Sequence, residues 1–368
     1  MQIHPSDILL REILEEPFCP SQRVRDHLGE CAFCRKRIRN LLAASRRSRP
    51  NYEYALGSNI EFIALWQRRL ILERAQAPRL LSVLLEQPET RRELLVRNHP
   101  RFQTWGLLEL ILEQSHEQTF NNPAGSEEMG NLALLVSDHL KPSLYGLERI
   151  EDLRARAWAY IGNSLRVRVN LAGAEKAFEK AFDHLRRGTG EVLERASILR
   201  LKGALRKDQH RFADSLHLLQ RTIQIFREAG DEHQVGSSLV SMSTIHHLQG
   251  EPDRAILLVN DALPRLDVRR EPRIVACAHI NLVGDLVIAG RFMEAQGALA
   301  RNRALYQQLA EPWLQSRLHY AQSAIYLEFG LRREAKTHLQ LAYEAFLGAN
   351  RPAIAAEVSE EILALPKG

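Results

Sequence analysis

Three residues with soft metal-binding side chains lie within eight positions near the start of the chain. They are His27, Cys31 and Cys34, in the segment HLGECAFC. On one continuous helix, offsets of four and three residues bring three side chains to the same face. Zinc favours four tetrahedral ligands, commonly cysteine sulfur and histidine nitrogen, so we expect this segment to bind zinc. The candidates for the fourth ligand are His4 and Cys19.

Four protein ligands would leave the metal no open position for water or substrate. We therefore expect a single structural Zn²⁺ rather than a hydrolytic centre. A helical head of this size would depend on that metal to fold. One alternative stays open, because free cysteine is often buried and the three side chains could be inert residues that face a core.

Length and composition limit what can position these residues. The chain has 368 residues, of which 45% are apolar and 26% charged, so it is too long for one compact core. It contains no apolar run long enough for a transmembrane helix, and its first residues are acidic where a signal peptide would be basic. Three of its four cysteines cluster between Cys19 and Cys34, which favours a metal or redox site in a reducing, cytoplasmic compartment.

Most of the remaining chain is an internal repeat. Five fifteen-residue segments align without gaps, with starts 41, 40, 40 and 40 residues apart, at Leu171, Phe212, Pro252, Phe292 and Arg332. Each carries a small residue at its fourth position, and a larger apolar residue follows four positions later (Ala174 with Phe178, Ser215 with Leu219, Ala255 with Val259, Ala295 with Leu299, Ala335 with Leu339). These spacings place both residues on one helical face.

A second apolar helix precedes each segment and ends in a turn, with glycine at Gly250, Gly290 and Gly330. Glycine suits the left-handed position that closes a helix. In the first copy Gly162, Ala174, Phe178 and Ala181 have the spacing of the small and aromatic positions of the tetratricopeptide repeat, which the array resembles. We expect an all-α fold with about six repeats over residues 100–350 and a final covering helix, PAIAAEVSEEILAL. The predicted domains are a head at 1–50, a helical linker at 51–100 and the array at 101–368.

The head resembles the zinc-binding anti-sigma factor fold, whose signature is a first His or Cys followed by His-x3-Cys-x2-Cys. Carried onto this sequence, the signature places His4 first and His27, Cys31 and Cys34 after it. The resemblance implies that the head holds a sigma factor away from RNA polymerase. It also implies an alternative redox switch, in which zinc is released and a disulfide forms, and Cys19 would permit this.

Positive charge concentrates in the head. The net charge is +5, and residues 1–50 contribute +4 of it, from ten Lys or Arg against six Asp or Glu. The run Arg35–Arg49 holds seven basic residues in fifteen, so an acidic partner would bind first at Arg35, Lys36, Arg37 and Arg39. Nucleic acid would also satisfy such a surface, although aromatic residues do not alternate with the basic ones.

No phosphate-binding glycine loop, H-E-x-x-H or G-x-S-x-G pattern occurs, so we expect a protein without enzymatic activity. Neighbouring helix pairs of such an array stack into a superhelix with a concave surface that holds peptides or protein segments. We therefore predict a cytoplasmic regulatory protein, with a zinc-stabilised head for a sigma factor and an array that recruits or senses another protein. The alternatives are an interaction scaffold whose zinc module is purely structural, and a basic nucleic-acid-binding regulator.

Overall fold

The computed structural model is all-helical over the residues that it describes, which confirms the predicted fold class. These residues are 27, 31, 34, 36, 37, 52–302, 305, 306, 311–349 and 351–365. No strand occurs in these ranges. A search of their helices finds none with both the length and the apolar character needed to cross a membrane.

The chain divides into two compact units, and two of its helices contribute residues to both. Unit 1 comprises 1–111 and 135–145, and unit 2 comprises 112–134 and 146–368. The shared helices are α6 (Trp105–Gln118) and α7 (Pro123–Asp138). The predicted boundaries at residues 50 and 100 stay predictions.

Unit 1 is built around a buried carboxylate on a long helix. Its other helices are α4 (Tyr52–Leu85), α5 (Glu89–Asn98), the 3₁₀ helix η1 (Pro100–Phe102) and α8 (Pro142–Tyr145). In its core, Glu73 Oε1 accepts hydrogen bonds of 2.7 Å from both the Tyr145 hydroxyl and Arg69 Nε. Burial, followed by the Glu73 carboxylate, raises the pKa of Tyr145 to about 12. A neutral phenol that donates to a carboxylate therefore ties α8 to α4.

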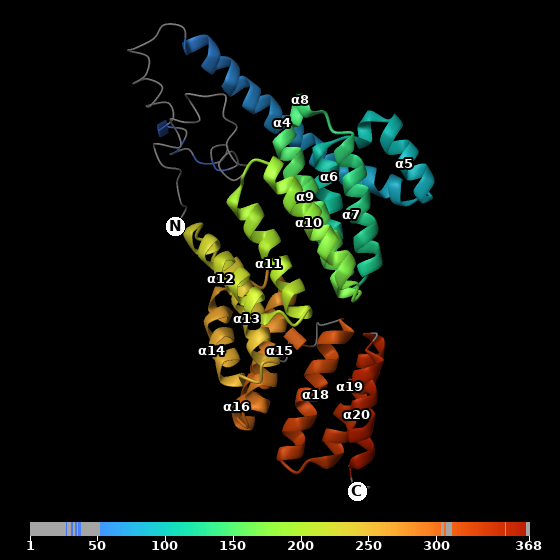
Figure 1. Cartoon of the computed structure of the whole chain (residues 1–368), viewed down its shortest axis with the longest axis vertical. Helices are drawn as coiled ribbons and strands as arrows, with labels where there is room; N and C mark the ends of the chain where they lie inside the picture. The colour runs from blue at the N-terminus through green and yellow to red at the C-terminus, as the bar shows by residue number, and fades with distance from the viewer. Residues whose placement is uncertain are drawn as a thin grey trace. The chain divides into compact units, whose positions relative to one another are not determined.

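Unit 2 is a stack of helix pairs (Figure 1). The first helices of successive pairs are α9 (Leu147–Val167), α11 (Val192–Asp208), α13 (Glu232–Leu248), α15 (Pro272–Ile288) and α18 (Pro312–Glu328). The second helices are α10 (Leu171–Arg187), α12 (Phe212–Glu228), α14 (Pro252–Ala262, continued by the 3₁₀ helix η2, Leu263–Arg265), α16 (Phe292–Arg301) and α19 (Arg332–Gly348). All five second helices begin where the aligned sequence segments begin. With α6 and α7 as a further pair, the described helices make six pairs, followed by α20 (Pro352–Ala364).

The small residues of the repeat are the points of closest packing. The fourth-position residues are all fully buried in the structure (Ala174, Ser215, Ala255, Ala295, Ala335). A side chain as small as alanine or serine lets the second helix approach the first helix of its own pair. Phe178 then fills the space beneath Gly162, where an added Cβ would lie 3.0 Å from the phenyl ring. The small and aromatic positions thus pack between the two helices of a pair, as their spacing predicted.

The turn inside each pair closes the first helix with a left-handed residue. Gly250, Gly290 and Gly330 have φ of 73°, 72° and 72°, which confirms the predicted role of these glycines. The amide after each glycine bonds back to a carbonyl five residues earlier, for example Glu251 N to His246 O at 2.9 Å. This is the Schellman arrangement, which satisfies the last carbonyls of the helix.

Val169 occupies the same left-handed turn position in the first of these repeats, with φ of 64°. A β-branched residue is strained there, and its side chain is 64% exposed, so little packing offsets the strain. We expect Val169→Gly to raise the free energy of unfolding by about 1 kcal/mol in chemical denaturation. The reverse change at the equivalent position, Gly250→Val, is the matched control and should lower it by about 1–2 kcal/mol. A stabilising effect of Gly250→Val would contradict this account of the turn.

Candidate functional site

The three predicted metal ligands converge in the head. One ligand atom each from His27, Cys31 and Cys34 lie within 4.8 Å of one another. His27 Nε2 lies 3.2 Å from Cys34 Sγ. Cys34 is fully buried, and His27 and Cys31 are half-buried. Burial and the neighbouring Cys31 thiol raise the pKa of Cys34, while the Arg37 guanidinium lowers it.

This donor set fits a tetrahedral zinc ion. Zn–S bonds of about 2.3 Å and Zn–N bonds of about 2.0 Å place neighbouring ligand atoms roughly 3.5–3.8 Å apart. The observed separations, 3.2 Å from His27 Nε2 to Cys34 Sγ and at most 4.8 Å for any pair, lie on either side of this range. Two thiolates and one imidazole are also the ligand types that structural zinc sites use. The set needs a fourth ligand, and both candidates, His4 and Cys19, lie outside the described residues.

One local expectation about the head was wrong. The sequence predicted a continuous helix through the three ligands, but Cys31 is not helical, whereas His27 and Cys34 are. The Cys31 amide still donates to the His27 carbonyl at 2.7 Å, which is the hydrogen bond of a helical turn. The ligand atoms therefore converge although the middle ligand, Cys31, is not helical.

The predicted partner-binding residues are only partly within the described structure. Lys36 and Arg37 are helical, with Lys36 exposed and Arg37 half-buried. Arg35 and Arg39 lie outside the described residues. An exposed lysine one turn or less from the ligands is compatible with a basic outer surface on the head, which stays a prediction.

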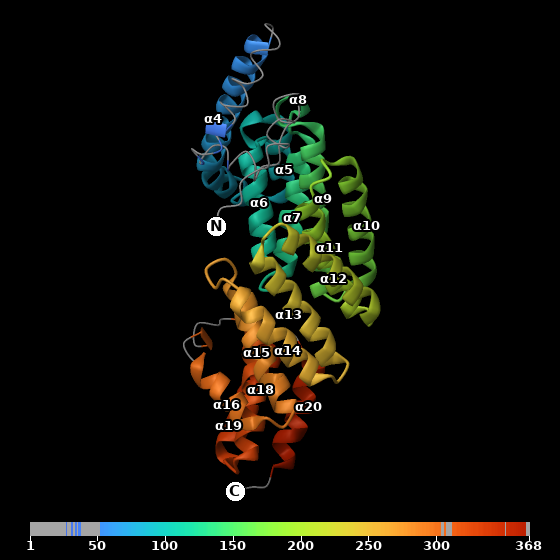
Figure 2. The same ribbon diagram turned by 90° about the vertical axis from the view of Figure 1, so that its left-hand side faces the viewer.

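In unit 2, the first helices of successive pairs contact one another directly from α9 to α18 (Figure 2). The described parts of successive second helices make almost no contact with one another. The stack therefore bends toward its first helices, whose shared side is concave. The first helices carry a set of half-buried residues that we name the first-helix face, and its members are Arg156, Tyr160, Ser197, Arg200, Gln234, Ser241, Arg273, Cys277 and Arg317.

Polar contacts cross this face from one repeat to the next. Arg156 Nε donates to Glu194 Oε1 at 3.0 Å, and Arg273 Nε donates to Glu311 Oε2 at 2.7 Å. Both pairs are separated by 38 residues, which is close to one repeat. A recurrent Arg-to-Glu spacing near the repeat length was the sequence signal that would have revealed these pairs. Two arginines of the first-helix face are thus each bonded to a glutamate of the next repeat.

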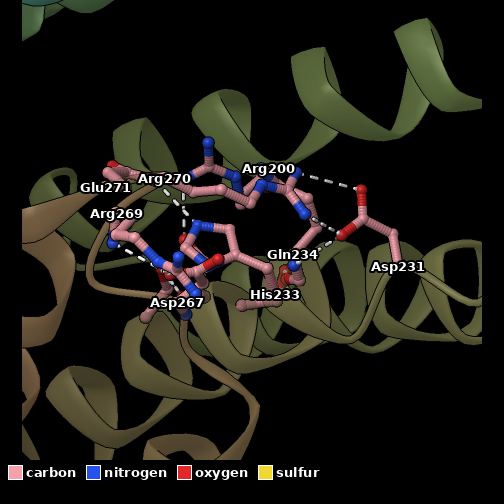
Figure 3. A network of polar contacts seen from close by, with 11 residues as sticks. Arg200, Asp231, His233, Gln234, Asp267, Arg269, Arg270 and Glu271 are labelled. Carbon is pink, nitrogen blue, oxygen red and sulfur yellow. Dashed lines mark hydrogen bonds and ion pairs between the residues drawn. The ribbon is translucent and has the colours of Figure 1, made fainter.

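A second polar network fixes the loop that leads into α15 against the start of α13 (Figure 3). Arg270 Nη1 donates to Asp231 Oδ1 at 2.8 Å, and the Asp267 amide donates to His233 Nδ1 at 3.0 Å. Burial would raise the pKa of Asp231, but the hydrogen bond and charge of Arg270 outweigh it and hold the pKa below its usual range. The network makes this edge of the first-helix face a preorganised surface.

Comparisons with known proteins agree with this geometry. Residues 194–267, which span α11 to the loop after α14, match a tetratricopeptide repeat family model. The array is a tetratricopeptide-like α-solenoid. A comparison with curated proteins finds no match.

Solved structures with a similar arrangement include aspartyl phosphate phosphatase F from Bacillus subtilis, at 13% identity and a TM-score of 0.48, covering 92% of this chain and 88% of that one. BtubC from P. vanneervenii is similar at 17% identity and a TM-score of 0.45, covering 64% of this chain and 90% of that one. A signal transduction ATPase with numerous domains and a tetratricopeptide repeat sensor, from Pyrococcus horikoshii, has 12% identity, a TM-score of 0.45, and coverage of 97% and 54%. At these identities and scores the likeness carries no statement about function.

Proposed function

We propose that this chain is a protein-interaction scaffold whose array binds a polypeptide on its first-helix face. The observation that carries the proposal is the character of that face. Its half-buried stripe bears charged and amide side chains held in place by contacts across repeats, such as Arg156 with Glu194, instead of the apolar residues that fill the layer between helices. A concave, preorganised and polar surface of this kind suits an extended segment that offers its own hydrogen-bonding groups.

A bulky substitution on the face tests this proposal. Ser241 lies on α13 at the centre of the stripe, and Gln220 is exposed on the second helix α12. With the full chain as bait in a lysate of the source cells, Ser241→Trp should abolish capture of the partner polypeptides identified by mass spectrometry with wild type. Gln220→Trp, the matched control, should retain them. Equal capture by both variants, with unchanged melting temperatures, would place binding elsewhere.

For the head we propose a zinc-stabilised module of anti-sigma type. The convergence of His27, Cys31 and Cys34 supports the binding of zinc. The resemblance of their spacing to the anti-sigma signature supports a sigma factor as the partner. In this proposal the zinc ion holds the fold of the head, and His4 supplies the fourth ligand ahead of Cys19. The head then presents Arg35, Lys36, Arg37 and Arg39 to an acidic surface of the sigma factor.

Metal analysis tests the zinc proposal directly. Full-length protein purified without chelator is expected to contain one zinc ion per chain, by elemental analysis. His27→Ala and Cys31→Ala should each lose it, because three remaining ligands hold a structural zinc ion poorly. Cys19→Ala should keep it if His4 is the fourth ligand. Wild-type protein with almost no metal would contradict the site.

Co-purification separates the partner hypotheses for the head. Recovery of a sigma factor that requires residues 1–60 supports the anti-sigma proposal. A scaffold with a purely structural zinc module would retain every partner through the array alone. A nucleic-acid-binding regulator would instead bind DNA with a steep dependence on salt, and would lose that binding on neutralisation of Arg35, Lys36, Arg37 and Arg39.

A further inference from the structure

Among the residues that the structure describes, several buried polar atoms of unit 2 have no hydrogen-bond partner. Three of them are Arg200 Nε on α11, Gln234 Oε1 on α13 and His116 Nδ1 on α6. An unsatisfied buried polar group costs about 1–3 kcal/mol, and more when the group is charged. Native structures rarely leave several such atoms in one place, so a ligand that satisfies them is a specific expectation.

The three side chains belong to one neighbourhood. Arg200 Nη1 donates to Ser237 Oγ at 3.3 Å, and Ser237 lies one helical turn after Gln234 on α13. The His116 ring stacks on Tyr160, with centroids 5.0 Å apart. Figure 3 shows Arg200 and Gln234 within the network at the start of α13. The orphaned atoms thus come from α6, α11 and α13 of unit 2, and the Arg200 guanidinium is close enough to His116 to act on its pKa.

Three guanidinium groups act on the His116 imidazole. Burial lowers the pKa of His116, and the Arg200, Arg156 and Arg273 guanidiniums lower it further, against one carboxylate, Glu271, that raises it. The imidazole is therefore neutral near pH 7. Arg156 and Arg273 are each paired with a carboxylate, so the charge that would attract an anion here is that of Arg200.

Arg200 differs from the other arginines around it. Arg156 is paired with Glu194, Arg273 with Glu311 and Arg270 with Asp231. Within the part of the chain that the structure describes, Arg200 has no carboxylate within ion-pair distance, and its one hydrogen bond goes to a serine hydroxyl. A desolvated guanidinium without a counter-charge is costly in a folded protein, and a bidentate carboxylate is its best-matched partner.

The orphaned atoms also specify what else the ligand carries. Arg200 Nε–H needs an acceptor, whereas Gln234 Oε1 can only accept and so needs a donor. An acidic residue of a polypeptide offers both, in its carboxylate and its backbone N–H. Sulfate and chloride offer acceptors alone at neutral pH, whereas hydrogen phosphate also carries a P–OH donor. An acidic residue supplies its acceptor and its donor from separate groups, which suits the two different side chains of Arg200 and Gln234.

We propose that Arg200, Gln234 and His116 bind an acidic residue of a partner polypeptide, with the carboxylate on the Arg200 guanidinium and the backbone N–H of that residue on Gln234 Oε1. In the tautomer with a proton on Nδ1, His116 donates a further hydrogen bond to the carboxylate. This inference rests on the proposed function of the first-helix face. It adds the type of residue that the face recognises in its partner.

Photocrosslinking with defined peptides tests the inference on the full chain. The probes are hexaglutamate with an amidated C-terminus, hexaglutamate with a free C-terminus, and amidated hexaglutamine, each carrying one benzophenone. Adducts are mapped by mass spectrometry. Adducts on the basic segment Arg35–Arg49 form in the same sample and serve as an internal reference. Amidated hexaglutamate that labels α11 and α13 indicates side-chain recognition, and labelling by the free acid alone indicates recognition of a terminal carboxylate.

We expect Arg200→Gln to reduce the array adducts of hexaglutamate at least about tenfold relative to the reference, since one buried charge-assisted pair is lost. Arg221→Gln makes the same charge change on the exposed side of α12 and should leave them within about twofold. Gln234→Met, which keeps the side-chain length and removes the acceptor, should reduce them by about three- to tenfold. If the Arg200 variant fails to fold, the Gln234 variant still tests the site.

The outcomes separate this inference from the proposed function. Array adducts that are the same in Arg200→Gln and wild type, or that form equally with hexaglutamine, would overturn the acidic-residue site and leave peptide binding on the face intact. If no probe labels the array and Ser241→Trp leaves all captured partners in place, the proposed function itself fails.

Discussion

Replacing Gly106 with alanine is expected to lower the stability of unit 1 by about 3 kcal/mol or more. Gly106 lies at the start of α6, where it touches the backbone of α4. An added Cβ would come within 2.5 Å of both the Arg74 amide nitrogen and the Glu73 carbonyl carbon. These are backbone atoms, so no side-chain rotation relieves the overlap and the helices must separate. Separation would also break the hydrogen bond of 3.3 Å from the Gly106 amide to Glu73 Oε2.

Gly284 provides the matched control for this prediction. It lies within α15, and an added Cβ there would meet nothing within 4 Å. Gly284→Ala should therefore stabilise unit 2 by up to about 1 kcal/mol, through helix propensity alone. Urea unfolding monitored by tryptophan fluorescence reports unit 1 through Trp66 and Trp105, both buried in its core. Equal stability of Gly106→Ala and wild type would show that the helix contact is not as close as the structure has it.

Replacing Phe178 with alanine is expected to cost about 3–5 kcal/mol, the usual range for a fully buried phenylalanine. Its ring is 0% exposed and belongs to a core cluster with Ala159, Leu205 and Ala181. It also covers Gly162 on the first helix of the same pair, as described above. In a repeat array such a loss uncouples neighbouring repeats, so the unfolding transition should also broaden.

Leu257→Ala is the control for the Phe178 variant. Leu257 lies on α14 and is 70% exposed, so its truncation should change stability by less than about 0.5 kcal/mol. Far-UV circular dichroism during thermal unfolding measures both variants, because the array is helical throughout its described residues. A cost below about 1 kcal/mol for Phe178→Ala would mean that the aromatic position of the repeat does not hold the pair together.

The sequence predicted the array well because its information is local and repeated. Period and helical spacing placed the start of every second helix at its observed residue, including Leu171 and Arg332. The buried small positions followed from the same spacing, as did the left-handed turn glycines such as Gly290. Each of these features is decided within a stretch of about one repeat, where the rules of helix geometry apply directly.

Contacts between residues that are far apart in the chain could not be predicted from the sequence. Gly106 sits in an unremarkable helical stretch, and only the path of α4 makes its missing Cβ essential. Arg200 looks like any other arginine of the array until the carboxylate partners of its neighbours are known. In the head, helical spacing alone did not predict that Cys31 is not helical. Such features depend on which elements meet in space, which a single sequence does not record.

The most direct test of the central claim is photocrosslinking from the array itself. A photoreactive amino acid is placed at Ser241 on the first-helix face, or at Gln220 on the exposed side of α12, in the full chain. We predict that the partner polypeptide crosslinks from Ser241, that the adduct maps to one extended acidic segment, and that Gln220 gives none. Crosslinks from Gln220 with none from Ser241 would contradict binding on the first-helix face.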